Sequence, residues 1–504
     1  MLLDPETCER ARQARDPRFD GRFFIAVRST GVYCRPVCRV RPPRAQNVRF
    51  YPSAAAAEEA GYRPCRRCRP ESAPGTPAWR GSVSTVSRAL GLIEAGALDR
   101  NGSVEALATR LGVGARHLRR LFAEHVGAAP LSVARTRRTH FARRLLDESD
   151  LPMAEIALAA GFGSVRQFND ALSATFHRTP TALRAARSSR LAREARAEGV
   201  RLRLALRPPF DWPALLDFLA LRAIPGVESV DGPRYRRAVG PRTAIEVTAE
   251  PDALAVRVLG ESPPDLIGVA ARVRRLFDLA ADPEPIARDL GADAVLAPRI
   301  RRRPGLRLLG AWDPFETAVR VVLGQQVSVA GASTLAGRVA VAFGKPVEEA
   351  LPGVLVRLFP AAEDLAEADL AGIGLTRARA AALRAVARAC ADGSLDLEGA
   401  APLEESLGAL TALPGIGDWT AQVIAMRALG EPDAFPAGDL GLRKALGRDG
   451  RPAPERRVRE RAEAWRPWRS YAAQWLWSDP HEPAPARSNR TGTRQNPRAR
   501  RKRT

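Results

Sequence analysis

The pattern of apolar and polar positions divides the chain into helical and strand-like regions. Apolar residues recur with helical spacing over much of 80–187 and again from about residue 310 to about residue 478. Between these regions, segments such as RYRRAVG and TAIEVTAE show the alternation of β-strands. A chain of 504 residues is too long for one hydrophobic core. The pattern therefore predicts a multidomain, mainly α protein with some sheet.

Two stretches without this periodicity predict domain boundaries. Residues 70–82 are rich in proline and small polar residues, and near 186–200 an arginine-rich helical stretch gives way to RLRLALRPPFDW. The C-terminal RSNRTGTRQNPRARRKRT has eight basic and no acidic residues, which predicts a disordered tail that touches DNA nonspecifically or only adds solubility. We expect domains over 1–72, 80–187, 198–300 and 301–482, with a basic tail over 483–504.

Two helix-turn-helix units are predicted in the first helical region. In SVEALATRLGVGARHLRRLFAEHVG, Ser103 caps the first helix and Gly112 marks the turn. LPMAEIALAAGFGSVRQFNDALSATFHRTP repeats the arrangement, with its turn at 161–163. The second helix of each unit would enter the major groove, and the alternative for any one side chain is a solvated helix surface. The candidates are Arg116, His117, Arg119, Arg120, Arg166, Gln167 and Asn169. Together the two units resemble the AraC-type DNA-binding domain.

A different DNA-binding pattern occurs near the C-terminus. ALTALPGIGDWTAQVIAMRALG predicts a helix, a tight hairpin and a second helix, with Gly415 and Gly417 needed for the backbone shape. The amides at the start of the second helix can hold a phosphate. The hairpin alone indicates only DNA binding. Asp439 in AFPAGDLGLRKAL lies downstream of it and resembles the acid of the helix-hairpin-helix glycosylases in type and distance, which implies a catalytic carboxylate.

The net charge favours a polyanionic partner. A formal charge of +23 and a pI near 11.1 fit nucleic acid, because binding phosphates releases condensed counterions. An acidic membrane is the rival, but no apolar run approaches the roughly 20 residues needed to span a bilayer. The N-terminus does not resemble a signal peptide, so we expect a cytoplasmic protein.

Four of the six cysteines form two close pairs, in GVYCRPVCRV and RPCRRCRP. Cys34, Cys38, Cys65 and Cys68 have the spacing of a tetrahedral zinc site, and zinc suits a reducing cytosol better than disulfides. Spacing alone favours a structural zinc site. The separate Cys8 and Cys390 are expected to be small apolar residues without chemistry.

The run from DGRFFIAVRSTGVYC to RPCRRCRP resembles the N-terminal domain of the Ada methylation-response proteins. The resemblance implies that Cys34 accepts a methyl group from a methylphosphotriester in DNA and that all four cysteines bind one zinc ion. Zinc holds a cysteine as the nucleophilic thiolate, and methylation would remove one negative charge and tighten DNA binding. Neighbouring arginines are candidates for phosphate contacts, namely Arg35, Arg39, Arg66, Arg67 and Arg69.

From about residue 200 to 480 the chain resembles the AlkA family of DNA-3-methyladenine glycosylases. The resemblance rests on RPGLRLLGAWDPFETAVRVVLGQQVSVA, LPGIGDWTA and AWRPWRSYAAQWLW, in the same order as in the family. It implies that Asp439 is the catalytic carboxylate and that Trp419 and Trp477 line the base pocket. A carboxylate stabilises an oxocarbenium-like state, and indole faces bind cationic alkylated bases that are flipped out of the helix. The simpler interpretation makes Asp439 a helix cap and the tryptophans core residues.

Three positions depart from the patterns of related glycosylases. Gln326 in GQQVSV stands where AlkA relatives have a leucine wedge, and Val423 stands where AlkA has a tyrosine. Bifunctional relatives have a lysine at the position of Trp419, so we expect a glycosylase without lyase activity. The chain also lacks the PCHR active site of the Ada alkylguanine methyltransferase, so O6-methylguanine repair is expected to be absent.

The resemblances together predict a small α+β zinc domain, an all-α double helix-turn-helix domain, an α+β AlkA N-terminal domain and an all-α helix-hairpin-helix glycosylase domain. We expect a monomer that binds double-stranded DNA and RNA polymerase, with one zinc ion and no organic cofactor. Two alternatives differ in class. One is a transcriptional regulator whose glycosylase half only binds DNA, and the other is a glycosylase whose zinc domain is only structural.

Overall fold

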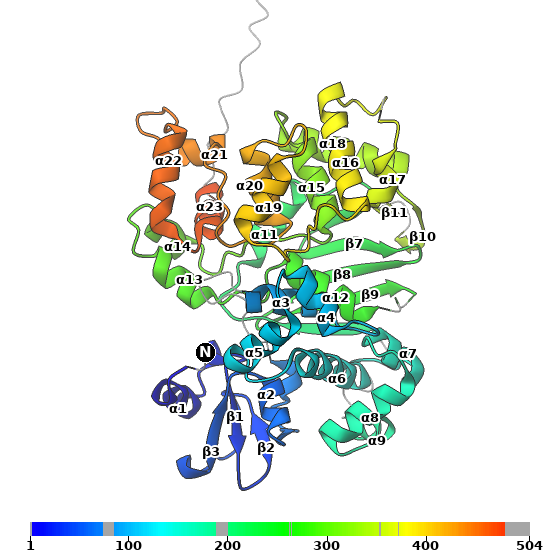
Figure 1. The fold of residues 1–504 in the computed structure, drawn as a ribbon, viewed down its shortest axis with the longest axis vertical. Helices are drawn as coiled ribbons and strands as arrows, with labels where there is room; N and C mark the ends of the chain where they lie inside the picture. Colours follow the sequence, from blue (N-terminus) through cyan, green and yellow to red (C-terminus); the bar gives the residue numbers. More distant parts are fainter. Residues whose placement is uncertain are drawn as a thin grey trace, which may run out of the picture.

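The computed structural model describes residues 3–73, 85–187, 200–261, 263, 265–351, 354–370 and 372–478. They form two stacked halves, with residues 3–187 below and residues 200–478 above in Figure 1. The predicted tail at 483–504 lies outside these residues, and the predicted boundaries at 70–82 and 186–200 do so in part. None of the described helices combines the length and apolar character of a membrane span.

The N-terminal region is a four-stranded sheet with helices on both faces. Its strand order is β3-β1-β2-β4, with β2 and β4 parallel and the other pairs antiparallel. All four residues of β1 are buried, because α1 packs on one face of the strand and α2 on the other. The elements are α1 (Pro5–Ala14), η1 (Pro17–Phe19), β1 (Phe24–Val27), β2 (Val32–Cys34), η2 (Ala45–Asn47), β3 (Val48–Tyr51), α2 (Ala54–Glu59), β4 (Arg63–Pro64) and η3 (Pro70–Ser72).

The next region is all helical and contains the two predicted helix-turn-helix units, joined by the 19-residue α6. Ser103 caps the first unit by accepting a hydrogen bond from Ala106, as predicted, and Gly112 and Gly161 have φ of +68° and +79° in the two turns. The elements are α3 (Thr85–Glu94), α4 (Val104–Arg110), α5 (Ala115–His125), α6 (Pro130–Glu148), α7 (Met153–Ala159), α8 (Val165–Phe176) and α9 (Pro180–Ala185).

The upper half begins with a five-stranded antiparallel sheet of order β5-β9-β8-β7-β6. The strand-like alternation of RYRRAVG and TAIEVTAE correctly predicted β7 and β8. The elements are β5 (Arg201–Ala205), α11 (Trp212–Ala220), β6 (Glu228–Asp231), β7 (Arg234–Gly240), β8 (Thr243–Glu250), β9 (Ala253–Gly260), α12 (Leu266–Leu276) and α13 (Pro283–Leu290).

The rest of the upper half is helical, with one short strand pair that the sequence analysis did not predict. The pair packs Val347 and Leu355 on Ala238 and Ala244 of the larger sheet. The elements are α14 (Leu296–Arg302), α15 (Pro314–Leu323), α16 (Val329–Phe343), β10 (Pro346–Leu351), β11 (Leu355–Arg357), α17 (Ala362–Ala366), α18 (Arg377–Ala391), α19 (Leu403–Thr411), α20 (Asp418–Arg427), α21 (Leu440–Ala445), α22 (Glu455–Ala462), η4 (Glu463–Trp465) and α23 (Arg469–Trp477).

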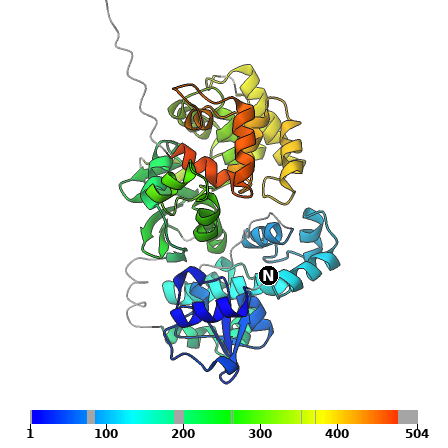
Figure 2. The ribbon, with the colours of Figure 1, turned by 90° about the vertical axis from the view of Figure 1, so that its left-hand side faces the viewer.

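One apolar cluster joins the two halves. It runs without interruption from Phe141 in α6, through the five-stranded sheet, to Leu476 in α23. Figure 2 shows the same stacking from the side, with the N-terminal sheet and the helix-turn-helix region beneath the upper half. The halves are therefore packed against each other by their cores.

Candidate functional site

The carboxylate of Asp439 lies where three helices meet. Asp439 caps α21, and its Oδ1 accepts a hydrogen bond of 3.0 Å from the backbone N–H of Leu442. Nε1 of Trp477, the last residue of α23, donates to the same oxygen at 2.9 Å. Nε1 of Trp419, in the first turn of α20, donates to Oδ2 at 3.1 Å. Three residues predicted from the sequence therefore lie together, and both indoles hold the carboxylate, which the sequence did not reveal.

The simpler interpretations of these residues account for only part of this arrangement. Asp439 does cap a helix, but a cap requires only the bond to Leu442 and leaves the two indole donors unexplained. Trp419 and Trp477 are only half-buried. Five other tryptophans are buried in the core, and Trp465, Trp468 and Trp475 among them have exposed fractions of 1%, 3% and 3%.

Gly441 is a further residue of this cluster that the sequence analysis missed. A Cβ at this position would lie 3.0 Å from Oδ1 of Asp439 and 3.3 Å from Cδ1 of Trp477. A larger residue would therefore push the indole away from the carboxylate. The only signal in the sequence is a glycine two positions after the acid, inside a short helix where glycine is otherwise unfavourable.

The hairpin between α19 and α20 requires one of its two glycines for its shape. Gly415 has φ of +78°, and a Cβ there would lie 2.7 Å from Cβ of Ala382. Gly417, the N-cap of α20, has φ of −88°, and a Cβ there would meet no atom within 4 Å. The prediction that Gly417 is needed for the backbone shape is therefore wrong. Its exposed position instead leaves room for a close approach to the start of α20.

The loop before α16 is fastened to this hairpin by Gln325. Its Nε2 donates to the carbonyl of Gly415 at 3.0 Å and to Oγ1 of Thr420 at 3.1 Å. The next residue, Gln326, is exposed and has φ of +54°, a left-handed conformation that is unusual for a residue other than glycine. Gln326 thus projects from a loop held beside Trp419, whereas the role of Gln325 in fastening this loop was not predicted from the sequence.

Val423 lies one helical turn after Trp419 on α20 and is half-buried.

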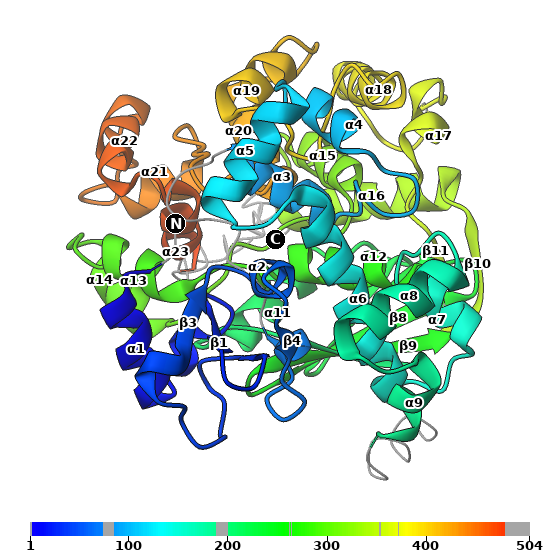
Figure 3. The same cartoon turned by 60° about the horizontal axis from the view of Figure 1, so that its bottom comes forward.

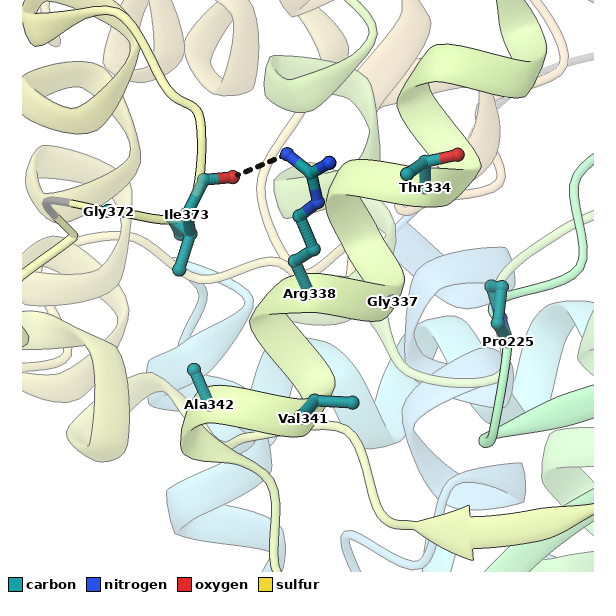
Figure 4. Close-up of a pocket in the computed structure, with 8 residues that line it drawn as sticks. All are labelled: Pro225, Thr334, Gly337, Arg338, Val341, Ala342, Gly372 and Ile373. Carbon is teal, nitrogen blue, oxygen red and sulfur yellow. Dashed lines mark hydrogen bonds between the residues drawn. The ribbon is translucent and has the colours of Figure 1, made fainter. Parts of the chain in front are cut away.

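A separate surface hollow of about 490 Å³ lies beside α16, where Arg338 donates to the carbonyl of Ile373 at 3.4 Å (Figure 4). The hollow is lined by Pro225, Thr334, Gly337, Arg338, Val341, Ala342, Gly372 and Ile373. It shares no residue with the Asp439 cluster, so it is not a base pocket of that cluster.

The four paired cysteines converge at the end of the N-terminal sheet. The Sγ atoms of Cys34, Cys38, Cys65 and Cys68 all lie within 4.8 Å of one another. A tetrahedral zinc ion with Zn–S bonds of about 2.3 Å separates its sulfur ligands by roughly 3.8 Å, so this donor set fits zinc. Cys8 is fully buried and Cys390 is half-buried, and burial raises the pKa of their thiols to about 11 and about 12. These two thiols are packing residues, as predicted.

The arginines around the cysteines divide into two groups. Arg35 is ion-paired with Asp20, and Arg69 is ion-paired with Glu71 and Asp147. These two arginines hold the protein together, so their prediction as phosphate contacts is not supported by their environment. The remaining candidates are exposed, namely Arg39, Arg66 and Arg67.

A buried polar cluster connects the cysteine region to α6. Tyr33, the residue before Cys34, donates its hydroxyl to Oε1 of Glu58 at 2.9 Å. The same oxygen lies 2.8 Å from Nε2 of His140, and Thr136 donates to Oε2 at 2.6 Å. Burial disfavours a charge on His140, but the Glu58 carboxylate outweighs burial and raises the pKa of the imidazole. The cluster therefore joins the sheet that carries Cys34 to the helix between the two helix-turn-helix units.

The second helix of each helix-turn-helix unit presents its polar candidates to solvent. Arg116, Arg119 and Arg166 are exposed, as are the other four candidates, His117, Arg120, Gln167 and Asn169. Arg119 pairs with Glu105 at 2.6 Å, and this contact is itself exposed. The structure therefore leaves both helices accessible to a large partner.

Family models match four successive parts of the chain, in the order that the sequence predicted. They are the metal binding domain of Ada (residues 7–71), a helix-turn-helix domain (107–186), the AlkA N-terminal domain (201–313) and the HhH-GPD superfamily base excision DNA repair protein (319–470).

Three curated proteins illustrate the similarity. The probable bifunctional transcriptional activator/DNA repair enzyme AlkA of Mycobacterium tuberculosis is 46% identical over 96% of this chain and 98% of its own length. DNA-3-methyladenine glycosylase 2 of Escherichia coli is 37% identical over 54% of this chain and 94% of its own length. The bifunctional transcriptional activator/DNA repair enzyme Ada of Escherichia coli is 38% identical over 30% of this chain and 40% of its own length.

Proposed function

The chain belongs to the family of bifunctional transcriptional activator/DNA repair enzymes AlkA, and we propose that it excises alkylated bases with Asp439 and senses methylphosphotriesters with Cys34. The glycosylase assignment rests on one observation above all. The carboxylate of Asp439 is held by two indole N–H groups at 2.9 and 3.1 Å, beside a hairpin of the kind that binds DNA.

The three donors to Asp439 fix the orientation of its carboxylate before substrate arrives. When the bond between C1′ and the base nitrogen breaks, the sugar develops positive charge, and a fixed carboxylate stabilises it without reorganising. Water then adds to C1′ and transfers its proton to the carboxylate, and the products are a free base and an abasic site. Trp419 offers no amine for a Schiff base, so the strand is not cut.

The substrates are bases of the 3-methyladenine and 7-methylguanine type. Such bases are cationic, so they leave without strong protonation and stack favourably on the electron-rich faces of Trp419 and Trp477. The flipped nucleotide leaves a gap in the duplex, which the exposed Gln326 fills. A glutamine that fills this gap is polar, and Val423 adds an aliphatic surface next to Trp419. Both residues therefore influence which alkylated bases the protein prefers.

The methyl-acceptor activity is assigned to the four-cysteine region. A zinc ion bound by Cys34, Cys38, Cys65 and Cys68 would keep the side chain of Cys34 in its thiolate form. Sγ of Cys34 attacks the methyl carbon of a methylphosphotriester, the new S–C bond replaces the C–O bond, and a phosphodiester anion leaves. The thiolate loses its negative charge, which lowers repulsion from the DNA backbone.

The regulatory activity uses the two exposed helices α5 and α8, with Arg116, Arg119 and Arg166 as DNA contacts. We place the protein in the cytoplasm as a monomer that binds double-stranded DNA at lesions and promoters and recruits RNA polymerase. The alternative is a regulator whose glycosylase half only binds DNA. That alternative does not explain why two indole N–H groups hold the carboxylate of Asp439.

The decisive experiment measures free base release from duplex DNA carrying methylated purines, with wild type and Asp439→Asn. Release by wild type and its loss in the variant would establish the glycosylase and its carboxylate. Absence of release by folded wild-type protein would refute the enzymatic proposal and leave the regulator. Equal release by both proteins would move the catalytic role to another residue.

A further inference from the structure

The helix pair α19–α20 has two ends with different surroundings. One end is the hairpin with Gly415 and Gly417. The other end, called here the hairpin base, consists of residues 392–400 before α19 and residues 429–431 after α20. Within the hairpin base, a Cβ on Gly399 would lie 3.2 Å from the carbonyl oxygen of Leu429, so its two segments are in close contact.

We propose that α3 and α4 of the regulatory half dock on the hairpin base and support the geometry of the glycosylase site, so that this docking couples the two activities. Figure 3 shows α3, α4 and α5 in front of the helices of the upper half, with α5 over α20. The contact has an ion-paired part, an apolar part and a part with two buried charges. Its effect on activity rests on the function proposed above, whereas the docking itself does not.

The charged part of the contact is centred on Arg110 at the end of α4. Its Nη2 lies 3.0 Å from Oδ2 of Asp396 and 3.0 Å from Oε2 of Glu398. These side chains are partly exposed, so each ion pair alone contributes little to stability. Their importance lies in specificity, because one arginine faces two acids of the other half.

The apolar part of the contact is centred on Ala400. Ala400 is 2% exposed and belongs to the core cluster of the first helix-turn-helix unit, with Val86, Leu92 and Leu107 among its members. The first unit of the regulatory half therefore completes its core with a residue of the glycosylase half. Separating the halves would expose this apolar surface.

The third part of the contact places the buried side chain of Arg88, in α3, near enough to buried Glu431 for their opposite charges to interact. Their exposed fractions are 9% and 1%, and Nε of Arg88 and Oε2 of Glu431 have no hydrogen-bond partner among the described residues. Burial raises the pKa of Glu431 to about 7, against the opposing charge of Arg88. Glu431 begins the loop that ends at Asp439, and the hydroxyl of Ser470 holds this loop by donating to the carbonyls of Glu431 and Ala434 at 2.7 Å. Docking thus bears directly on the segment that positions the carboxylate.

The geometry allows docking and DNA binding at the same time. α19 has nine residues and is therefore about 13 Å long, which separates the hairpin base from the hairpin itself. The regulatory half consequently supports the helix pair from the end away from the hairpin. DNA held by α5 stabilises the unit that docks, and by reciprocity DNA held by the hairpin stabilises the docked state.

The test exchanges charges across the contact in the full-length chain. Arg110→Glu places a negative charge opposite Asp396 and Glu398, so the contact becomes repulsive. A triple variant that adds Asp396→Arg and Glu398→Arg to Arg110→Glu restores the attraction with the charges reversed. The matched control is Arg388→Glu, which breaks an exposed ion pair with Glu367 within the glycosylase half. Each protein is assayed for single-turnover base release from duplex DNA with methylated purines and for calorimetric unfolding.

We expect Arg110→Glu to slow base release about three- to tenfold and to lower the unfolding temperature more than the control variant does. The combined exchange should return the rate to within about twofold of wild type, and the control should not change it. Equal rates for Arg110→Glu and Arg388→Glu, or failure of the exchange to restore the rate, would overturn the proposal. If folded wild type releases no base, the proposed glycosylase function fails, and the unfolding of the exchanged variants alone decides whether the halves dock.

Discussion

Trp477 donates a hydrogen bond of 2.9 Å from its indole nitrogen to the carboxylate of Asp439, across 38 positions of the chain. The bond joins the last residue of α23 to the cap of α21 and turns a tryptophan expected only to stack on a base into a positioning residue. Trp419 makes the equivalent bond to the other carboxylate oxygen. The site is therefore a carboxylate held between two indoles.

Replacing Trp477 by phenylalanine tests this positioning role. The ring remains as a stacking surface, but the donor to Oδ1 is lost, so the carboxylate gains rotational freedom. We expect kcat for base release to fall about tenfold with a smaller change in KM. A rise in KM with unchanged kcat would instead show that Trp477 acts only in base binding. Trp475→Phe is the control, because that indole bonds to the carbonyl of Arg303 in the core.

The two roles of Asp439 can be separated by comparing two substitutions. Asparagine is a good N-cap, so Asp439→Asn should keep the stability of α21 while lowering base release by at least about a hundredfold. Asp439→Ala should lower release equally and also cost about 1 kcal/mol of stability. Thermal unfolding and single-turnover release measure these effects. Near-normal release by a folded asparagine variant would show that the carboxylate charge is not required.

The two hairpin glycines should respond differently to alanine. Gly415→Ala places a Cβ at φ of +78° and 2.7 Å from Cβ of Ala382, so we expect a loss of about 1 to 3 kcal/mol in stability. Gly417→Ala should fold normally, because its Cβ meets no protein atom within 4 Å. A weaker affinity of Gly417→Ala for undamaged duplex DNA would then report a close approach of the phosphate backbone. Equal unfolding temperatures for the two variants would contradict the difference.

The cysteine region predicts a stoichiometric reaction. Incubation with duplex DNA carrying methylphosphotriesters should add one methyl group to the peptide containing Cys34, as measured by mass spectrometry. Cys34→Ser should remain unmodified, whereas the control Cys8→Ser should still be methylated, because Cys8 is fully buried away from the four-cysteine cluster. Removal of zinc with a chelator should abolish the transfer and destabilise the N-terminal sheet. Methylation at another cysteine would refute the assignment.

The Glu58–His140 pair predicts how pH affects the contact between the N-terminal sheet and α6. The carboxylate raises the pKa of His140 above 6.5, so its contribution is complete below that value and is lost as the pH rises through the folded pKa. Burial opposes ionisation of Glu58, yet His140 and two hydroxyl donors lower its pKa below 4.5, so its contribution is lost on acidification. Stabilisation is therefore greatest between about pH 4.5 and 6.5.

A pH series with His140→Gln measures this contribution. We expect the variant to be less stable than wild type by about 1 to 3 kcal/mol at pH 6 and the difference to shrink towards pH 9. Unfolding temperatures recorded across that range provide the comparison, and Glu58→Gln should remove the same dependence. A stability difference that is constant from pH 6 to pH 9 would show that His140 is not charged in the folded protein.

The sequence predicted the order and type of the domains because their signals are local. Cysteine pairs, capped helices, glycine turns and a hairpin are each written within a few tens of residues, and the family models match in the same order. The strand pair β10–β11 was missed because its packing partner is a sheet more than 80 positions earlier in the chain. A separation of 90 positions likewise explains why the hydrogen bond from Gln325 to Gly415 was not predicted.

The sequence by itself determined which residues are available for chemistry: a carboxylate after a hairpin, two tryptophans and four paired thiols. The tertiary structure alone decided how they act, because hydrogen bonds and ion pairs require atoms within about 3 to 4 Å and sequence separation does not limit which residues meet. In the folded protein two indoles donate hydrogen bonds to Asp439. Arg35 and Arg69 form internal ion pairs. Arg110 forms ion pairs with Asp396 and Glu398. These contacts depend on how whole helices pack, and that packing is a property of the complete fold.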